Sequence, residues 1–122
     1  MRDHKKLRAF DLAHSLVLDV YRLTRSFPKE ETYGLTSQIR RSAVSVTSNI
    51  VEGCARPTER DYAHFLSISY ASACELQYQL KLSGELGFIP ETDAATIHRS
   101  AESVAKILSA LIQALRAECL AP

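Results

Sequence analysis

The sequence predicts an all-α protein, an antiparallel up-and-down four-helix bundle that forms one domain over residues 1–122. Apolar residues recur every three or four positions in four separate segments, which is the spacing that gives a helix an apolar face. No segment alternates apolar and polar residues with the period of two that marks a strand. Short connections join the four segments, and short connections favour antiparallel neighbours in a bundle.

The first helix is expected over residues 7–26. Pro28 ends it, because the residue before a proline avoids the helical region of backbone angles. Asp11 and Asp19 lie on the polar side of this helix. Its apolar face is formed by Phe10, Ala13, Leu16, Val17, Val20, Tyr21 and Leu23.

The second helix is expected over residues 34–53, with Gly53 as a C-terminal cap. Its main apolar stripe consists of Leu35, Ile39, Ala43, Val46 and Ile50. A polar stripe beside it consists of Gln38, Ser42, Ser45, Asn49 and Glu52. Val44 and Val51 form a second, smaller apolar stripe nearly opposite the first, because each residue turns the helix by about 100°.

The third helix is expected over residues 58–86, where Thr58 is the N-cap and Asp61 resembles the acidic partner of a capping box. Glycines and a proline in the stretch SGELGFIP indicate its end. Its apolar stripe consists of Tyr62, Phe65, Leu66, Ser69, Ala73, Leu76 and Leu80. The apolar residues well off this stripe are Ile68, Leu82 and Leu86.

The fourth helix is expected over residues 93–119, with Thr92 or Asp93 as its cap. It has the cleanest single stripe of the chain, formed by Ile97, Ala101, Val104, Leu108, Leu111, Ile112 and Leu115. Its opposite face is polar throughout. A single apolar face is what a helix of an isolated bundle requires.

The second and third helices carry more apolar positions than one bundle core can cover. The extra residues lie off the main stripe of each helix, as Val51 and Ile68 do. We therefore expect another copy of the chain to cover this second face and form a homo-oligomer. The alternative is that these residues are ordinary scattered surface apolars.

Composition limits the class of protein and its compartment. The 122 residues suit one domain, and a net charge of +1 gives no global electrostatic case for nucleic acid. The three cysteines Cys54, Cys74 and Cys119 form no C-x-x-C pair and are expected to be reduced, mostly buried thiols. The basic N-terminus lacks the apolar region of a signal peptide, and no apolar run approaches the ~20 residues of a membrane span. A cytoplasmic protein without membrane contact is expected.

The order FPKEExYGLTSQIRRSAVSVxSNIxEG, read from residue 27, resembles the four-helix-bundle family of proteins encoded in bacterial 23S rRNA intervening sequences. This family includes the accessory variability proteins of diversity-generating retroelements. The resemblance begins with LRAFDLAHSLVLDVYRLTRSFP and continues through RPTERDYAHFLSISYASACELQYQL, so that it covers residues 7–88. Over the fourth helix the chain agrees with the family only in pattern.

The resemblance implies an up-and-down bundle that assembles into a barrel-like homopentameric ring. Two departures stand out, because the family usually has Trp where this chain has Phe10 and Pro where it has Thr47. Losing that proline should straighten the second helix and restore a backbone hydrogen bond. The retroelement relatives are basic and work with a reverse transcriptase and its RNA, a role for which this nearly neutral chain is less suited.

The sequence gives little indication of an enzyme. Glycine-rich phosphate loops are absent, and no Glu-x-x-His pair of the di-iron bundles occurs. The four histidines show no metal-ligand spacing, so no cofactor or metal is expected. The alternative is acid–base catalysis by Glu52 and Glu75 near Asn49 in the bundle.

We interpret the polar stripe mainly as an assembly network, which would pair carboxylates within the chain or with a neighbouring subunit. A buried carboxylate requires such partners, and polar networks can fix register and oligomeric state. The residues expected in this network are Gln38, Arg41, Ser45, Asn49, Glu52 and Glu75.

A scaffold or partner-binding role is therefore the leading functional hypothesis, and sequence-nonspecific RNA or DNA binding is the alternative. Basic patches repeated around a ring would bind phosphates in a salt-dependent way. The residues expected to contact nucleic acid are Lys5, Lys6, Arg22, Arg25, Arg40, Arg56 and Arg60. Against this hypothesis, 15 basic residues are balanced by 14 acidic ones, as on an ordinary solvated surface.

Overall fold

The protein is all-helical and contains the four long helices that the sequence predicts. The computed structural model describes residues 2–120, and only the backbone of residues 119 and 120. No strand occurs in this part of the chain. The four helices are α1 (Arg8–Thr24), α2 (Leu35–Cys54), α3 (Glu59–Glu85) and α4 (Glu91–Leu120). Two 3-10 turns, η1 (His4–Lys6) and η2 (Lys29–Glu31), precede α1 and α2.

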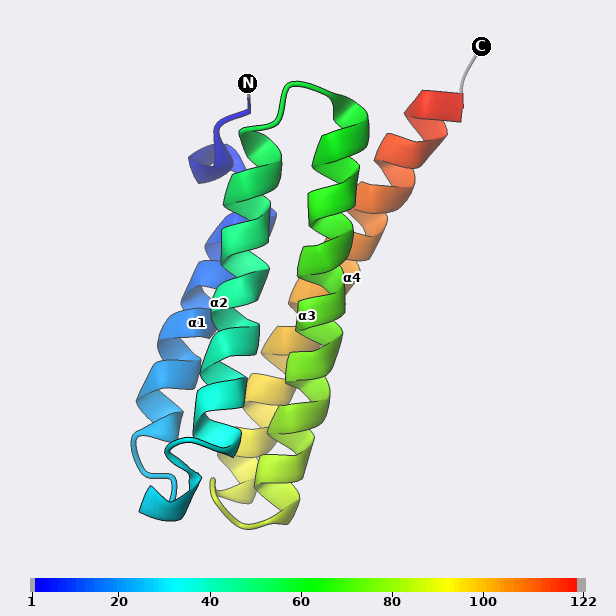
Figure 1. Cartoon of the computed structure of the whole chain (residues 1–122). Helices are drawn as coiled ribbons and strands as arrows, with labels where there is room; N and C mark the ends of the chain where they lie inside the picture. The colour runs from blue at the N-terminus through cyan, green and yellow to red at the C-terminus, as the bar shows by residue number, and fades with distance from the viewer. Residues whose placement is uncertain (1, 121–122) are drawn as a thin grey trace.

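The helices pack as a bundle in which each one contacts its neighbours in the sequence and α1 also contacts α4. Figure 1 shows the α1–α2 and α3–α4 connections at one end of the molecule and the α2–α3 connection at the other. The N-terminus lies beside the α2–α3 connection. No helix within residues 2–120 is long and apolar enough to cross a membrane.

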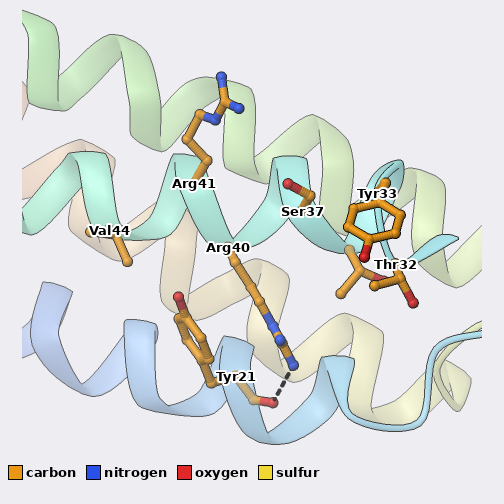
Figure 2. A pocket seen from close by; sticks show the side chains of 8 residues that line it. Tyr21, Thr32, Tyr33, Ser37, Arg40, Arg41 and Val44 are labelled. Atoms are coloured by element: carbon orange, nitrogen blue, oxygen red, sulfur yellow. Dashed lines mark hydrogen bonds between the residues drawn. The ribbon is translucent and has the colours of Figure 1, made fainter. Parts of the chain in front are cut away.

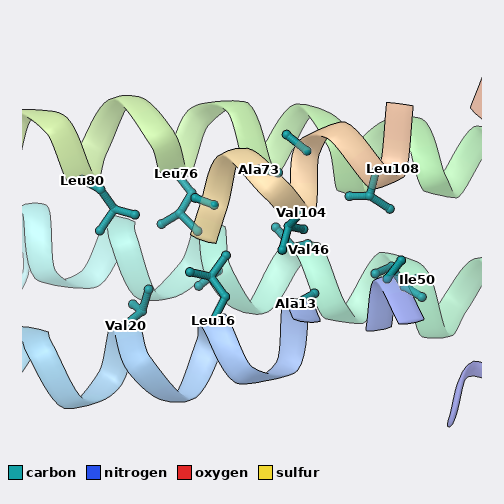
Figure 3. Close-up of a cluster of buried hydrophobic side chains, with 14 of the residues drawn as sticks. Ala13, Leu16, Val20, Val46, Ile50, Ala73, Leu76, Leu80, Val104 and Leu108 are labelled. Atoms are coloured by element: carbon teal, nitrogen blue, oxygen red, sulfur yellow. The ribbon is translucent and has the colours of Figure 1, made fainter. Parts of the chain in front are cut away.

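The core is formed by the predicted apolar stripes. Figure 3 shows side chains from all four helices meeting along the axis of the bundle. The largest of the fully buried apolar side chains are Leu16, Ile39, Ile50, Leu66, Leu76, Leu80 and Leu108. These branched side chains point inward from helices at 3.6 residues per turn, so the spacing of the stripes accounts for the core directly.

The ends of α3 follow the predicted local chemistry. The Thr58 side chain accepts a hydrogen bond from the Asp61 backbone N–H at 3.1 Å, as an N-cap does. After α3 the chain turns at Gly87, whose φ of 77° lies in the left-handed region that glycine adopts freely. The Phe88 N–H then donates to the Ser83 carbonyl at 2.9 Å, which closes the last turn of the helix.

The predicted cap of α4 is wrong. Neither Thr92 nor Asp93 precedes the helix, because α4 already begins at Glu91, directly after Pro90. The Ala94 N–H donates to the Pro90 carbonyl at 2.9 Å and starts the helix there. Proline suits this place, because the first N–H groups of a helix have no partner inside it and proline has none to lose.

The family proline that this chain lacks would stand inside α2. The helix runs unbroken from Leu35 to Cys54 through Thr47. The Thr47 hydroxyl donates to the Val44 carbonyl at 2.9 Å, which adds a bond where proline would remove one. The continuous helix agrees with the expectation drawn from this departure.

Gly53 is not the C-terminal cap that the sequence suggested. It is buried inside α2, and the capping position falls on Ala55. A Cβ atom at Gly53 would lie 3.1 Å from the Phe65 Cβ and 3.3 Å from the Tyr62 carbonyl oxygen. Gly53 therefore lets α3 approach α2 closely near their connection.

We expect Gly53→Leu to lower the free energy of unfolding by about 1–3 kcal/mol, because the larger side chain must displace α3. Chemical denaturation followed by circular dichroism measures the change. Ala55→Leu is the matched control, because Ala55 is exposed two residues further on and its replacement should change stability by less than about 0.5 kcal/mol. Equal stability of the Gly53 variant and the parent would contradict the close approach.

Candidate functional site

The contact between α2 and α3 is built from small polar side chains. The Ser45 and Ser72 hydroxyls lie 2.8 Å apart and share a hydrogen bond. The fully buried Ser69 hydroxyl donates to the Val46 carbonyl at 2.7 Å. Small side chains let the two helices lie close, and each hydroxyl gains a partner that it needs when buried. We call this line of contacts the α2–α3 seam.

Two parts of the predicted polar network form along this seam. The Asn49 amide donates to the Ser45 carbonyl at 2.8 Å and to its hydroxyl at 3.1 Å. The Glu75 carboxylate accepts hydrogen bonds from Ser42 at 3.3 Å and from Gln79 at 3.1 Å. The structure thus brings Ser45 and Asn49 together, and separately joins Glu75 to α2 through Ser42.

The six predicted residues do not form one network within the chain. Glu52 pairs with Arg56 one helical turn on, not with Arg41. Gln38 and Arg41 are exposed, and neither has a side-chain hydrogen bond or ion pair to another described residue. Both carboxylates, Glu52 and Glu75, are exposed in the single chain. A pairing of Arg41 across a subunit interface stays a prediction.

Gln79 is a seam residue that the sequence did not single out. Its side chain is buried, and its amide nitrogen donates to Glu75. Its amide oxygen has no partner among the described residues. A buried acceptor without a donor is unfavourable, so an additional hydrogen-bond donor would stabilise this end of the seam.

The predicted nucleic-acid residues fall into two groups at opposite ends of the bundle (Figure 1). The group near the α1–α2 connection consists of Arg22, Arg25 and Arg40. The group near the α2–α3 connection consists of Lys5, Lys6, Arg56 and Arg60. Arg22 pairs with Asp19 at 2.9 Å, and Arg56 is engaged by Glu52. These ion pairs reduce the positive charge that each group offers to a phosphate.

A cavity of about 470 Å³ lies where the end of α1, the loop around η2 and the first turns of α2 meet (Figure 2). Sequence reasoning missed this cavity, because it depends on the path of the loop between the two helices. Its lining contains two arginines and no carboxylate. The lining residues are Tyr21, Thr32, Tyr33, Thr36, Ser37, Arg40, Arg41 and Val44.

Arg40 is held firmly at the floor of this cavity. Its Nε donates to the Thr24 hydroxyl at 2.8 Å, and its Nη2 to the Tyr21 carbonyl at 3.5 Å, the bond drawn in Figure 2. The guanidinium carbon lies 4.7 Å from the centre of the Tyr21 ring. A cation over an aromatic face is attracted by the ring, so three contacts fix this side chain.

The chain matches the family model described as 23S rRNA-intervening sequence protein over residues 5–110. The chain belongs to this family. A solved structure from Bacteroides thetaiotaomicron, a protein with unknown function from the S23 ribosomal protein family, has the same fold with a TM-score of 0.79. It is 22% identical to this chain, and the match covers 85% of this chain and 97% of the other. A comparison with curated proteins finds no match.

This member of the 23S rRNA-intervening sequence family offers few groups for chemistry. Within residues 2–118, no three His, Cys, Asp or Glu side chains come close enough to bind a metal ion. Cys54 is buried, whereas Cys74 is exposed, contrary to the expectation that the thiols are mostly buried. The side chain of Cys119 lies outside the described residues.

The N-terminal segment of this family member is fixed by Arg2. Its guanidinium lies 4.0 Å above the Tyr62 ring and pairs with Glu59, and its backbone N–H donates to the Cys54 carbonyl at 3.3 Å. Burial of Tyr62 raises its pKa from the ordinary 10.0 to about 12, and burial also raises the pKa of the Cys54 thiol. Both groups are neutral at ordinary pH, and the Tyr62 ring and the Cys54 carbonyl hold Arg2 beside the α2–α3 connection.

The raised pKa of Tyr62 predicts a loss of stability at alkaline pH. Between about pH 10 and 12 the phenol ionises in the unfolded chain and stays protonated in the folded one. The folded state then binds more protons, so the free energy of unfolding falls as the pH rises, by roughly 1–2 kcal/mol from this group. Urea denaturation at several pH values measures the fall.

The control for this prediction is Tyr62→Phe, which has no phenol to ionise. Its stability should decline less steeply over the same pH interval, whatever its stability at neutral pH. Parallel pH dependence of the parent and the Phe variant would show that the Tyr62 phenol titrates normally.

Proposed function

We propose that the chain is a cytoplasmic, non-enzymatic protomer, an antiparallel up-and-down bundle that assembles into a ring-like homopentamer. In this proposal the assembly serves as a scaffold or binds a partner. The family resemblance supports the ring, and the surface of α2 and α3 supports the assembly.

The observation that carries the proposal is the set of large apolar side chains left uncovered on α2 and α3. Val44 and Val51 of α2 are 38% and 37% exposed, and Ile68 of α3 is 37% exposed. Leu86, near the end of α3, is 53% exposed. None of them is part of the buried core, and each leaves apolar surface in contact with water. A second copy of the chain would remove them from water.

Exposed polar side chains of α2 and α3 also suit an interface between copies. Gln38 and Arg41 of α2 are exposed without a described side-chain partner, and Glu75 of α3 is exposed and accepts two hydrogen bonds. Ile68 and Glu75 lie seven residues apart, two helical turns, and therefore on one face of α3. An apolar centre with hydrogen-bonding groups around it is the usual composition of a protein interface. Pairing of Arg41 with a neighbour would fix the register of the assembly.

The non-enzymatic part of the proposal rests on the state of the seam hydroxyls. A serine nucleophile must be reachable and activated by an adjacent base. Ser42 donates to Glu75 but is itself buried, and the Ser45 hydroxyl is engaged by Ser72 and Asn49. These hydrogen bonds support a role for the hydroxyls in joining α2 to α3.

We expect Ile68→Asp and Val51→Asp to dissociate the assembly, because each places a charge at the proposed interface. Both side chains are more than a third exposed, so the fold should persist. Multi-angle light scattering gives the mass of each variant, and circular dichroism gives its helicity. The parent should have the mass of five chains.

Leu18→Asp is the matched control for this experiment. Leu18 lies on α1, is 58% exposed, and should tolerate a charge without a change in mass. A parent protein with the mass of one chain at micromolar concentration would refute the assembly. Unchanged mass in both α2 and α3 variants would place the interface elsewhere.

We infer a second candidate function, nonspecific binding of RNA or DNA through phosphates. It is favoured by the cavity beside α2, whose lining contains Arg40 and Arg41 but no carboxylate. Phosphate contacts release condensed counterions, so the affinity of such binding falls steeply with salt.

We therefore expect a structured RNA to bind at low ionic strength and to lose affinity by tenfold or more, as an order of magnitude, when salt is raised to physiological concentration. Fluorescence anisotropy of labelled RNA at the two salt concentrations measures this. Absence of binding at low salt would remove the second candidate and leave the scaffold proposal intact.

A further inference from the structure

We propose that the cavity between α1 and α2 is a binding site for a nucleotide unit. Arg40 and Arg41 bind its phosphate, and the exposed ring of Tyr33 stacks on its base. The proposal rests on the second candidate function and gives it a specific site. One chain supplies every residue of the site, so the site can be tested on the protomer.

The size and charge of the cavity fit this ligand. About 470 Å³ lies within the usual range of about 300–1,000 Å³ for small-molecule sites. The Glu31 carboxylate is not part of the lining, and its Oε1 accepts the Leu35 backbone N–H at 3.0 Å. The charged groups of the lining are its two arginines, as a phosphate requires.

The two arginines differ in how their side chains are held. Arg40 is fixed by Thr24 and Tyr21, and these bonds occupy only two of its N–H groups. A guanidinium has five N–H donors, so Arg40 has others left for a phosphate. Arg41 extends along the other side of α2 in Figure 2 and has no partner among the described residues to give up. Binding of one phosphate by both arginines requires Arg41 to turn toward Arg40.

Thr36 is an independent indication of a ligand. Its side chain lines the cavity and is only 7% exposed, yet its hydroxyl has no hydrogen-bond partner in the described part of the chain. Buried hydroxyls are normally bonded, and a phosphate oxygen would accept from this one. Thr36 and Ser37 also lie in the first turn of α2, where the partial positive charge of the helix favours an anion.

Tyr33 provides the proposed contact with the base. It stands in the loop directly before α2, and 97% of the residue is exposed. A tyrosine that packs against nothing contributes little to the fold. In nucleic-acid sites such exposed rings stack on bases, next to cations that hold the phosphates. Figure 2 shows the Tyr33 ring beside the first turn of α2.

Four substitutions test the site with little risk to the fold. Arg41→Gln and Tyr33→Ala change exposed side chains, and Tyr33→Phe keeps the ring but removes its hydroxyl. Thr36→Val removes the unpaired hydroxyl at constant shape. Two matched controls lie on other helices, Arg99→Gln on α4 and Tyr78→Ala on α3, and both residues are exposed.

The probes are adenosine monophosphate and a short unstructured single-stranded oligoribonucleotide, each added at low salt to ¹⁵N-labelled protein. We expect amide shifts confined to the loop after η2 and the first turns of α2. Arg41→Gln and Tyr33→Ala should each weaken binding by about tenfold. Thr36→Val should weaken it severalfold, whereas Tyr33→Phe and both controls should bind like the parent.

The two probes distinguish the source of the nucleotide. Shifts with adenosine monophosphate support a site for a free nucleotide, and shifts with the oligonucleotide alone support a strand that needs several phosphates. If neither probe shifts these amides at millimolar concentration, the proposal is overturned. If the oligonucleotide binds but the control variants lose as much affinity as Arg41→Gln and Tyr33→Ala, nonspecific binding stands and this site is refuted.

Discussion

The close approach of α2 and α3 is the constraint on which the rest of the structure depends. It is possible because Gly53 has no side chain and because serines meet along the two helices. A buried serine needs a hydrogen-bond partner, and the approach supplies one, as when Ser69 donates to the Val46 carbonyl. Packing and polar bonding thus support each other, and a larger residue in the seam would disturb both.

Apart from its core side, α2 has three sides with different surroundings. Because each residue turns the helix by about 100°, neighbours in the sequence face different partners. Arg40 reaches Tyr21 of α1 and closes the cavity floor, while Ser42 reaches Glu75 of α3. Val51 faces neither partner and is left partly exposed. Because only the remaining side of α2 belongs to the core, the amphipathic pattern of this helix is weak.

The sequence predicts the helices well, because a core stripe repeats with the period of the helix whatever surrounds it. It predicts special positions less well. In the sequence, Gly53 could indicate either the end of a helix or a close contact between helices. The position of α3 in the structure shows that it is a close contact. Asn49 bonds to Ser45 and Glu52 pairs with Arg56, because a partner four residues away on a helix is always within reach. The cavity could not be predicted, since no periodicity governs the loop that forms one of its walls.

Val44 connects the two proposals, because it lines the cavity and also belongs to the uncovered apolar residues of α2. A neighbouring copy that covers Val44 would become part of the cavity wall. Ligand binding and assembly would then be thermodynamically linked, and the factor by which one changes the other would be the same in both directions. A nucleotide that binds more tightly to the assembled chain must strengthen the assembly equally.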